Sequence, residues 1–156
     1  MHRVFVYGTL KKCEPNHHWL TDTKNGVSKF IGDGETLEKY PLVIATKYNI
    51  PFLLYKPGTG NNVKGEIYEV DEKMLKNLDI LEDHPNFYER DQYLLKNLQT
   101  NETNQCWVYF LKKFQPYLLE KEFYTSYSNN GSHGLKYSER YLRTPDYVAK
   151  DYVYQK

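Results

Sequence analysis

The sequence has few cysteines, no long hydrophobic run and almost no net charge. Its 156 residues include only Cys13 and Cys106 as cysteines, too few for the disulfide framework of a small secreted protein. No apolar run approaches the roughly 20 residues that span a bilayer, and the N-terminus lacks a signal-peptide core. The formal net charge of +1 lacks the basic excess of nucleic-acid-binding proteins. We therefore expect a cytoplasmic protein with reduced thiols, without a membrane segment or a nucleic-acid partner.

Tyrosine is the residue that the chain holds in excess, with 16 copies. It combines a large ring with a polar hydroxyl, so it suits half-buried strands and wet pockets. Hydrophobic residues make up 40% of the chain and charged residues 26%, which is typical of a folded globular protein. The length favours a single domain with its own core, and the pattern shows no linker and no repeat.

Short strands dominate the hydrophobic pattern, and one helix stands out among them. Alternating or apolar runs predict strands at 3–7, 27–31, 34–38, 41–45, 52–55, 63–70, 87–98 and 105–111. Asp71 is a good N-cap for a helix over 72–83, which Pro85 ends. Short helices are expected at 15–20 and 115–124. Many short strands around one main helix predict an α+β fold, a small mixed β-barrel with one main helix and short helices.

The helix over 72–83 carries one carboxylate on its apolar side. At about 100° per residue, its apolar stripe consists of Met74, Leu75, Leu78 and Leu81. Glu82 falls within this stripe, whereas Asp79 is expected on the solvated side. Ile80 lies off the stripe, which suggests that a second face of the helix is also covered.

The position of Glu82 favours a role in proton transfer. Burial and the negative end of the helix dipole are expected to raise the pKa of Glu82 toward neutrality. A general acid or base works best when its pKa lies near the operating pH. The alternative is that Glu82 lies at the edge of the stripe and reaches water or pairs with Arg90.

The turn Tyr7-Gly8-Thr9-Leu10 follows the first predicted strand and could hold a small anion. Glycine lets the backbone turn sharply and approach a ligand. Successive N–H groups in such a turn can converge on a carboxylate or an oxyanion, and Thr9 adds a hydroxyl. An ordinary turn is the alternative, because glycine turns after strands are common. Together with Glu82, the turn indicates acid–base chemistry on a small, charged substrate that carries an amine.

Motifs for metal or cofactor chemistry are missing. The five histidines show no metal-ligand spacing, and the sequence has neither a phosphate loop nor a dinucleotide-binding fingerprint. Cys13 and His17 lack a surrounding acyl-transfer motif, which disfavours a thiol–histidine pair. We therefore expect neither a metal nor an organic cofactor.

Several motifs, by their order and spacing, resemble the γ-glutamylcyclotransferase-like superfamily and within it the AIG2-like γ-glutamylaminecyclotransferases. They are VFVYGTLK at 4–11, PNH at 15–17, YPLVIA at 40–45, NIP at 49–51, GEIYEVDE at 65–72, MLKNLD at 74–79, YER at 88–90 and HGLKY at 133–137. The resemblance runs from about residue 3 to 138, so we expect a domain over 1–138 and a tyrosine-rich extension over 139–156. Cys13, Glu14 and Ser132 depart from the family pattern, which bears on substrate choice more than on reaction type.

The resemblance implies an intramolecular cyclisation. The α-amine of a γ-glutamyl group attacks its own side-chain amide carbonyl, and the products are 5-oxoproline and a free amine. That amine would be lysine when the substrate is γ-glutamyl-ε-lysine. By resemblance, the general acid/base corresponds to Glu82, and the residues that bind the substrate correspond to Tyr7, Gly8, Thr9, Leu10, Ile50 and Tyr127. The resemblance also implies a cofactor-free, monomeric, cytoplasmic lyase of isopeptide degradation.

Two other functions remain open on the sequence. One is an enzyme of the same fold that acts on γ-glutamyl amino acids or on glutathione. The other is a catalytically silent binding module, for which the tyrosine-rich tail could supply contacts, since tyrosine is favoured at interfaces. The tail is otherwise expected to pack on its own barrel or to stay mobile. The tyrosines from residue 137 onward are Tyr137, Tyr141, Tyr147, Tyr152 and Tyr154.

Overall fold

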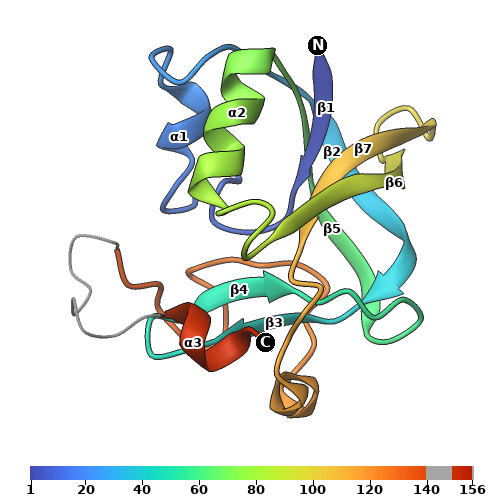
Figure 1. Ribbon diagram of the computed structural model, residues 1–156. Helices are drawn as coiled ribbons and strands as arrows, with labels where there is room; N and C mark the ends of the chain where they lie inside the picture. The colour runs from blue at the N-terminus through green and yellow to red at the C-terminus, as the bar shows by residue number, and fades with distance from the viewer. Residues whose placement is uncertain (140–148, 156) are drawn as a thin grey trace.

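Five strands close into a mixed barrel in the order β1-β5-β2-β6-β7 (Figure 1). The strands are β1 (His2–Val6), β2 (Ser28–Tyr40), β5 (Asn61–Val70), β6 (Glu89–Asn97) and β7 (Thr103–Phe110). Neighbouring strands are antiparallel, except that β1 and β7 pair in parallel and so close the barrel. The computed structural model describes residues 1–139 and 149–155. The predicted α+β mixed barrel is confirmed.

The remaining elements lie outside the barrel wall. They are the hairpin strands β3 (Leu42–Ala45) and β4 (Ile50–Leu53), the helices α1 (His18–Thr21), α2 (Glu72–Leu81) and α3 (Ala149–Val153), and the 3₁₀ helix η1 (Pro116–Glu120). Figure 1 shows α1 and α2 side by side near β1. The β3–β4 hairpin and α3 lie below the C-terminal end of α2 in this view.

The strand β2 is longer than predicted. The sequence suggested two strands, over 27–31 and 34–38, but the structure has one strand with register shifts between Phe30 and Gly32 and between Glu35 and Lys39. A bulge bends a strand without ending it, so β2 can follow the barrel wall. Gly34 allows the Ile67 side chain to pack closely against β2, because a Cβ at residue 34 would lie 2.9 Å from that side chain.

The main helix begins and packs as its sequence predicts, with one exception. Asp71 caps α2 by accepting a hydrogen bond from the backbone N–H of Met74 at 2.9 Å. The buried residues of α2 form the predicted apolar face and are Met74, Leu75 and Leu78. The expected cover on a second face is wrong, since Ile80 is 77% exposed. The face of α2 that carries Ile80 is therefore open to solvent.

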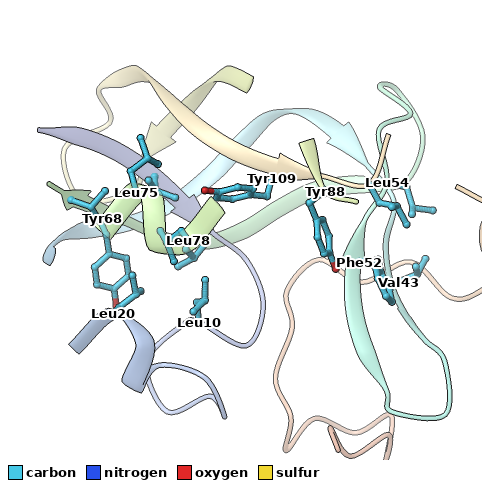
Figure 2. Close-up of a cluster of buried hydrophobic side chains, with 14 of the residues drawn as sticks. Leu10, Leu20, Val43, Phe52, Leu54, Tyr68, Leu75, Leu78, Tyr88 and Tyr109 are labelled. Carbon is cyan, nitrogen blue, oxygen red and sulfur yellow. The ribbon is translucent and has the colours of Figure 1, made fainter. Parts of the chain in front are cut away.

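The hydrophobic core reaches from α2 to the hairpin. Figure 2 shows Leu75 and Leu78 of α2 on one side of Tyr109, and Phe52 of β4 with Tyr88 on the other. The rings of Phe52 and Tyr88 stack with centroids 6.0 Å apart. Full burial of a leucine or phenylalanine side chain contributes about 1.5–3 kcal/mol, so this cluster holds the end of α2 and the hairpin in fixed relation.

The end of the chain packs back onto the body of the protein. Val153 of α3 is fully buried, and its carbonyl accepts a hydrogen bond from the Gln115 N–H at 2.7 Å. The ring of Tyr154 meets that of Phe87 edge to face, with centroids 6.2 Å apart. Tyr141 and Tyr147 lie outside the described residues. The division of the chain between 138 and 139 stays a prediction.

Candidate active site

A pocket of about 210 Å³ opens where the end of β1, the end of α2 and the hairpin meet. Of the predicted site residues, those that line the pocket are Tyr7, Gly8, Thr9, Leu10, Ile50 and Glu82. Tyr127, which we also expected at the wall, does not line it. That residue lies in the core of the barrel and stacks on His133, while Tyr137 lines the pocket.

The turn after β1 is held from behind by the residues that precede α1. The Thr9 carbonyl accepts a hydrogen bond from the Asn16 N–H at 2.9 Å, and the Gly8 carbonyl accepts one from the Lys11 N–H at 3.2 Å. The Leu10 carbonyl lies 2.8 Å from Nδ1 of His17, which must therefore be the donor. These contacts fix the direction of three successive carbonyl groups.

The same contacts determine where the N–H groups of the turn point. In a trans peptide the N–H of one residue points opposite to the carbonyl of the residue before it. The N–H groups of Thr9 and Leu10 therefore point away from Lys11 and Asn16, the residues whose N–H groups bind the Gly8 and Thr9 carbonyls. Within 1–139 and 149–155, no group accepts a hydrogen bond from either of them. Such a pair of N–H groups is suited to an anionic ligand.

Gly8 allows the hairpin to approach this turn closely. A Cβ at Gly8 would lie 3.0 Å from Cγ of Pro51, tighter than most real contacts. Pro51 belongs to β4 and lines the same pocket. A side chain at residue 8 would therefore separate the turn from the wall of the pocket.

Glu82 is the C-cap residue of α2 and reaches the pocket from the helix end. Its N–H donates to the Leu78 carbonyl at 2.9 Å, and its carbonyl accepts a hydrogen bond from the Tyr88 N–H at 3.2 Å. The backbone of Glu82 is thus held on both sides while its partly buried side chain lines the cavity. The alternative pairing of Glu82 with Arg90 is not formed, because Arg90 binds Asp79.

A polar network lies beside the end of the helix. Asp79 accepts hydrogen bonds from Nε of Arg90 at 2.6 Å, from Nη2 of Arg90 at 3.0 Å and from the Tyr109 hydroxyl at 2.6 Å. The Tyr109 carbonyl in turn accepts a hydrogen bond from the Tyr7 hydroxyl at 2.7 Å. The expectation that Asp79 faces solvent is wrong: its side chain is 21% exposed, because Arg90 and Tyr109 reach it from β6 and β7.

Two pKa shifts follow from this arrangement. Burial alone would raise the pKa of Asp79, but hydrogen bonds from Arg90 and Tyr109 outweigh it and bring the pKa below its ordinary value. Burial, and then the nearby charge of Glu82, raise the pKa of Tyr7 well above its ordinary value. Tyr7 therefore stays a neutral hydrogen-bond donor beside a carboxylate.

The predicted site residues did not include Asn16, Phe87, Tyr109 or Tyr137, which also line the pocket. Asn16 and Tyr137 lie within the PNH and HGLKY motifs. These motifs carried the resemblance to the family but gave neither residue a role in binding or catalysis. Tyr109 and Phe87 carry no local signal, because their place at the pocket depends on how β6, β7 and the hairpin meet.

The part of the chain that the structure describes shows neither a metal-binding cluster nor a membrane helix. No group of three or more histidine, cysteine, aspartate or glutamate side chains within 1–139 and 149–155 could hold a metal ion. None of the helices among these residues is long and apolar enough to cross a membrane. The expected absence of a cofactor stays a prediction.

Known proteins share both the sequence and the fold. The family of gamma-glutamyl cyclotransferases described as AIG2-like matches residues 4–129. Gamma-glutamylaminecyclotransferase C of Danio rerio is 49% identical over 149 residues, which cover 93% of this chain and 98% of that protein. The gamma-glutamylaminecyclotransferase of Homo sapiens is 43% identical over 147 residues, covering 88% of this chain and 96% of the human protein.

A crystal structure of an AIG2-like protein from Mus musculus superposes with a TM-score of 0.88 at 46% sequence identity. The match covers 92% of this chain and 99% of the mouse chain. The similarity therefore includes nearly the whole of each protein, and the fold and the sequence point the same way. This chain belongs to the AIG2-like gamma-glutamyl cyclotransferase family.

Proposed function

We propose that this chain is a γ-glutamylamine cyclotransferase, with γ-glutamyl-ε-lysine or related γ-glutamylamines as its substrates. One observation carries the proposal: a single pocket brings the side chain of Glu82 together with the donor-rich turn of Thr9 and Leu10. The names of the relatives in Danio rerio and Homo sapiens support amines, rather than α-amino acids, as the leaving groups.

Glu82 would serve as both base and acid in the reaction. It takes a proton from the substrate's α-ammonium, and the free amine attacks the γ-carbonyl carbon to form the ring C–N bond. Glu82 then gives this proton to the leaving nitrogen while the original amide C–N bond breaks. The ring nitrogen, which still carries two hydrogens, loses one of them, and the freed amine takes up that proton as an ammonium ion. The products are 5-oxoproline and an amine. Proton transfer by a positioned side chain contributes about 10²–10⁴-fold in rate.

The pocket would supply most of the remaining rate by holding a folded substrate. The nucleophile and the carbonyl belong to one molecule, so the enzyme has to select the conformer in which they meet. A correctly held intramolecular attack can be worth about 7–11 kcal/mol at best. Tyr88 and Phe52 stack into a rigid aromatic wall, and both line the cavity, which limits the conformers that fit.

The decisive experiment measures the release of 5-oxoproline. The intact protein is incubated with γ-glutamyl-ε-lysine and, in parallel, with a γ-glutamyl α-amino acid and with glutathione. We expect 5-oxoproline and lysine from the first substrate at the highest kcat/KM. A preference for either of the other substrates would assign the chain to the alternative enzyme of the same fold. If none of the three substrates yields 5-oxoproline, the remaining alternative is a catalytically silent binding module.

Glu82→Gln tests the catalytic group within the same assay. The variant keeps the shape of the side chain but removes the carboxylate, so turnover is expected to fall by at least about 100-fold. Glu69→Gln is the matched control, because Glu69 lies on β5 outside the pocket. Near-parental turnover by Glu82→Gln would reject Glu82 as the acid and base.

The cellular setting belongs to the same proposal. We expect a monomer in the cytoplasm that completes isopeptide degradation by freeing lysine from γ-glutamyl-ε-lysine. The near-zero net charge supports the absence of a nucleic-acid partner. Light scattering of the purified protein would show a mass of one chain, 18.6 kDa, if the monomer is correct.

A further inference from the structure

Asn16 is a buried polar residue that neither the sequence nor the proposed mechanism has yet explained. It is 4% exposed and lines the pocket behind the turn at residues 7–10. Its side-chain nitrogen donates to Oγ1 of Thr9 at 3.0 Å and to the Tyr137 hydroxyl at 2.9 Å. A primary amide has two N–H hydrogens, so both are used in these contacts.

This arrangement determines what the Thr9 hydroxyl can do. A hydroxyl that accepts a hydrogen bond from an amide must direct its own hydrogen elsewhere. The Tyr137 hydroxyl accepts the second hydrogen of the side-chain amide, and the backbone N–H of Asn16 donates to the Thr9 carbonyl, so both the side chain and the backbone of Asn16 are held in place. Thr9 lines the pocket, and its hydroxyl is thereby made a donor.

The resulting site presents three donors on one turn. They are the Thr9 hydroxyl and the backbone N–H groups of Thr9 and Leu10. An ionised carboxylate accepts hydrogen bonds only, through two oxygens with about four lone-pair directions. A developing oxyanion is a single oxygen, typically served by two donors. Three adjacent donors therefore fit a carboxylate better.

We propose that Asn16 is a positioning residue that makes the Thr9 hydroxyl a hydrogen-bond donor to the α-carboxylate of the γ-glutamyl group. The inference rests on the proposed function, since it takes the ligand to be a γ-glutamyl compound. The carboxylate keeps the same charge in the bound substrate and in the transition state. Its binding is thus uniform, and losing a donor raises KM while kcat stays nearly unchanged.

The test is a double-mutant cycle with Asn16→Leu and Thr9→Val. Each change removes the polar group at nearly constant size, and Asn16→Leu leaves the backbone N–H of residue 16 in place. In the parent protein, Asn16→Leu is expected to raise KM for γ-glutamyl-ε-lysine by about 10- to 100-fold. In the Thr9→Val background it should add less than about 2-fold, because the hydroxyl that it orients is gone.

Asn97→Leu is the matched control for a merely structural effect. Asn97 is also a buried asparagine, 7% exposed, but it lies on β6 outside the pocket. The control is expected to lower the unfolding temperature and to leave KM within about 2-fold of the parent value. If Asn97→Leu raises KM as much as Asn16→Leu does, positioning by Asn16 is rejected.

A binding measurement separates this inference from the proposed function. 5-Oxoproline keeps the α-carboxylate, so calorimetry on the intact protein should show its affinity reduced by about 10-fold or more in Asn16→Leu. If the intact protein turns over no substrate, the proposed function is refuted. The 5-oxoproline affinities of the parent and Asn16→Leu would still show whether Asn16 positions a carboxylate donor. Three results for Asn16→Leu would each overturn the inference. The first is a fall in kcat at constant KM, and the second is a rise in KM that persists in the Thr9→Val background. The third is an unchanged affinity for 5-oxoproline.

Discussion

Arg90 and Asp79 form a two-point ion pair, with Nε 2.6 Å from Oδ1 and Nη2 3.0 Å from Oδ2. Arg90 comes from β6, whereas Asp79 lies on α2 three residues before Glu82. The guanidinium also lies over the ring of Trp107 on β7, 4.3 Å from its centroid. The pair therefore ties the end of the helix to the barrel, and so it sets the position from which Glu82 reaches the pocket.

Breaking this pair should cost both stability and activity. Asp79→Asn leaves Arg90 half-buried without its countercharge, and we expect the free energy of unfolding to fall by about 2 kcal/mol, somewhat less than for a fully buried pair. kcat should fall as well, because the end of α2 loosens around Glu82. Urea unfolding and steady-state kinetics measure the two effects.

Asp91→Asn is the control for that variant. Asp91 pairs with Lys112 at 3.6 Å, and its side chain is 63% exposed. An exposed pair contributes less than about 1 kcal/mol, so stability and kcat should stay close to parental. Equal losses in Asp79→Asn and Asp91→Asn would contradict the anchoring role of Arg90.

The pair should also make stability depend on pH at the acid end. The pKa of Asp79 is lower in the folded than in the unfolded protein, where it is about 3.9. The ionised carboxylate therefore stabilises the fold fully above that value, and the contribution is lost as pH falls through the lower, folded-state pKa. The stability difference between the parent and Asp79→Asn should be constant near neutrality and shrink below about pH 4. Acid unfolding curves of the two proteins that stay parallel throughout would contradict this.

Gly8→Val should impair the pocket through steric contact. A Cβ at residue 8 already meets Pro51 Cγ at 3.0 Å, and valine adds two methyl groups. The turn and the hairpin must then separate, which moves the N–H groups of Thr9 and Leu10. We expect kcat/KM to fall by at least about 10-fold in steady-state assays.

Gly58→Ala provides the comparison for Gly8. It introduces strain at a φ of +89° in a turn with open space around it, so it should cost about 1 kcal/mol of stability. Its kcat/KM should match the parent value, since Gly58 is not among the residues that line the cavity. Parental kinetics in Gly8→Val would show that the ligand binds elsewhere.

Tyr7→Phe distinguishes a structural hydroxyl from a proton-transfer group. Burial, and then the charge of Glu82, raise the pKa of Tyr7 well above its ordinary value, so Tyr7 stays protonated near neutral pH. The variant should lose about 1 kcal/mol of stability with its hydrogen bond to the Tyr109 carbonyl. The acid limb of its kcat/KM profile against pH should stay where it is in the parent.

The matched variant is Tyr40→Phe, at a tyrosine in the barrel core whose pKa burial raises to about 12. Tyr40 does not line the pocket, so its pH profile should also match the parent. If the acid limb disappears only in Tyr7→Phe, then Tyr7 rather than Glu82 carries the titrating proton.

Local sequence signals predicted those elements whose formation depends on nearby residues. The N-cap of α2 needs only Asp71 and the N–H of Met74, three residues away, and it formed as expected. The apolar stripe through Leu75 and Leu78 likewise follows from helical period, which is independent of what covers it. The predicted break between the strands at 27–31 and 34–38 was wrong, because the bulges in β2 depend on its pairing with β5.

The candidate site shows the same division. The turn at Gly8 and the carboxylate at Glu82 were found from local pattern and from family resemblance. The sequence pointed to Tyr127 at the pocket wall, whereas Tyr137 lies there. Both tyrosines belong to an irregular segment, which has no periodic pattern from which its path could be deduced. Asp79 was wrongly assigned to the solvated side of α2. The helical period gives the direction of its side chain, but it cannot show that Arg90 of another element lies opposite.

The sequence by itself determined the main helix and most of the strands, and it made Glu82 and the turn after β1 candidates for the site. Only the tertiary structure decided that these two, 72 or more positions apart along the chain, line one cavity. It also decided that Asn16 stands behind Thr9 and that Arg90 reaches Asp79. The physical reason is that local conformation depends on neighbours in sequence, whereas hydrogen-bond direction and burial depend on groups that closure of the barrel brings together.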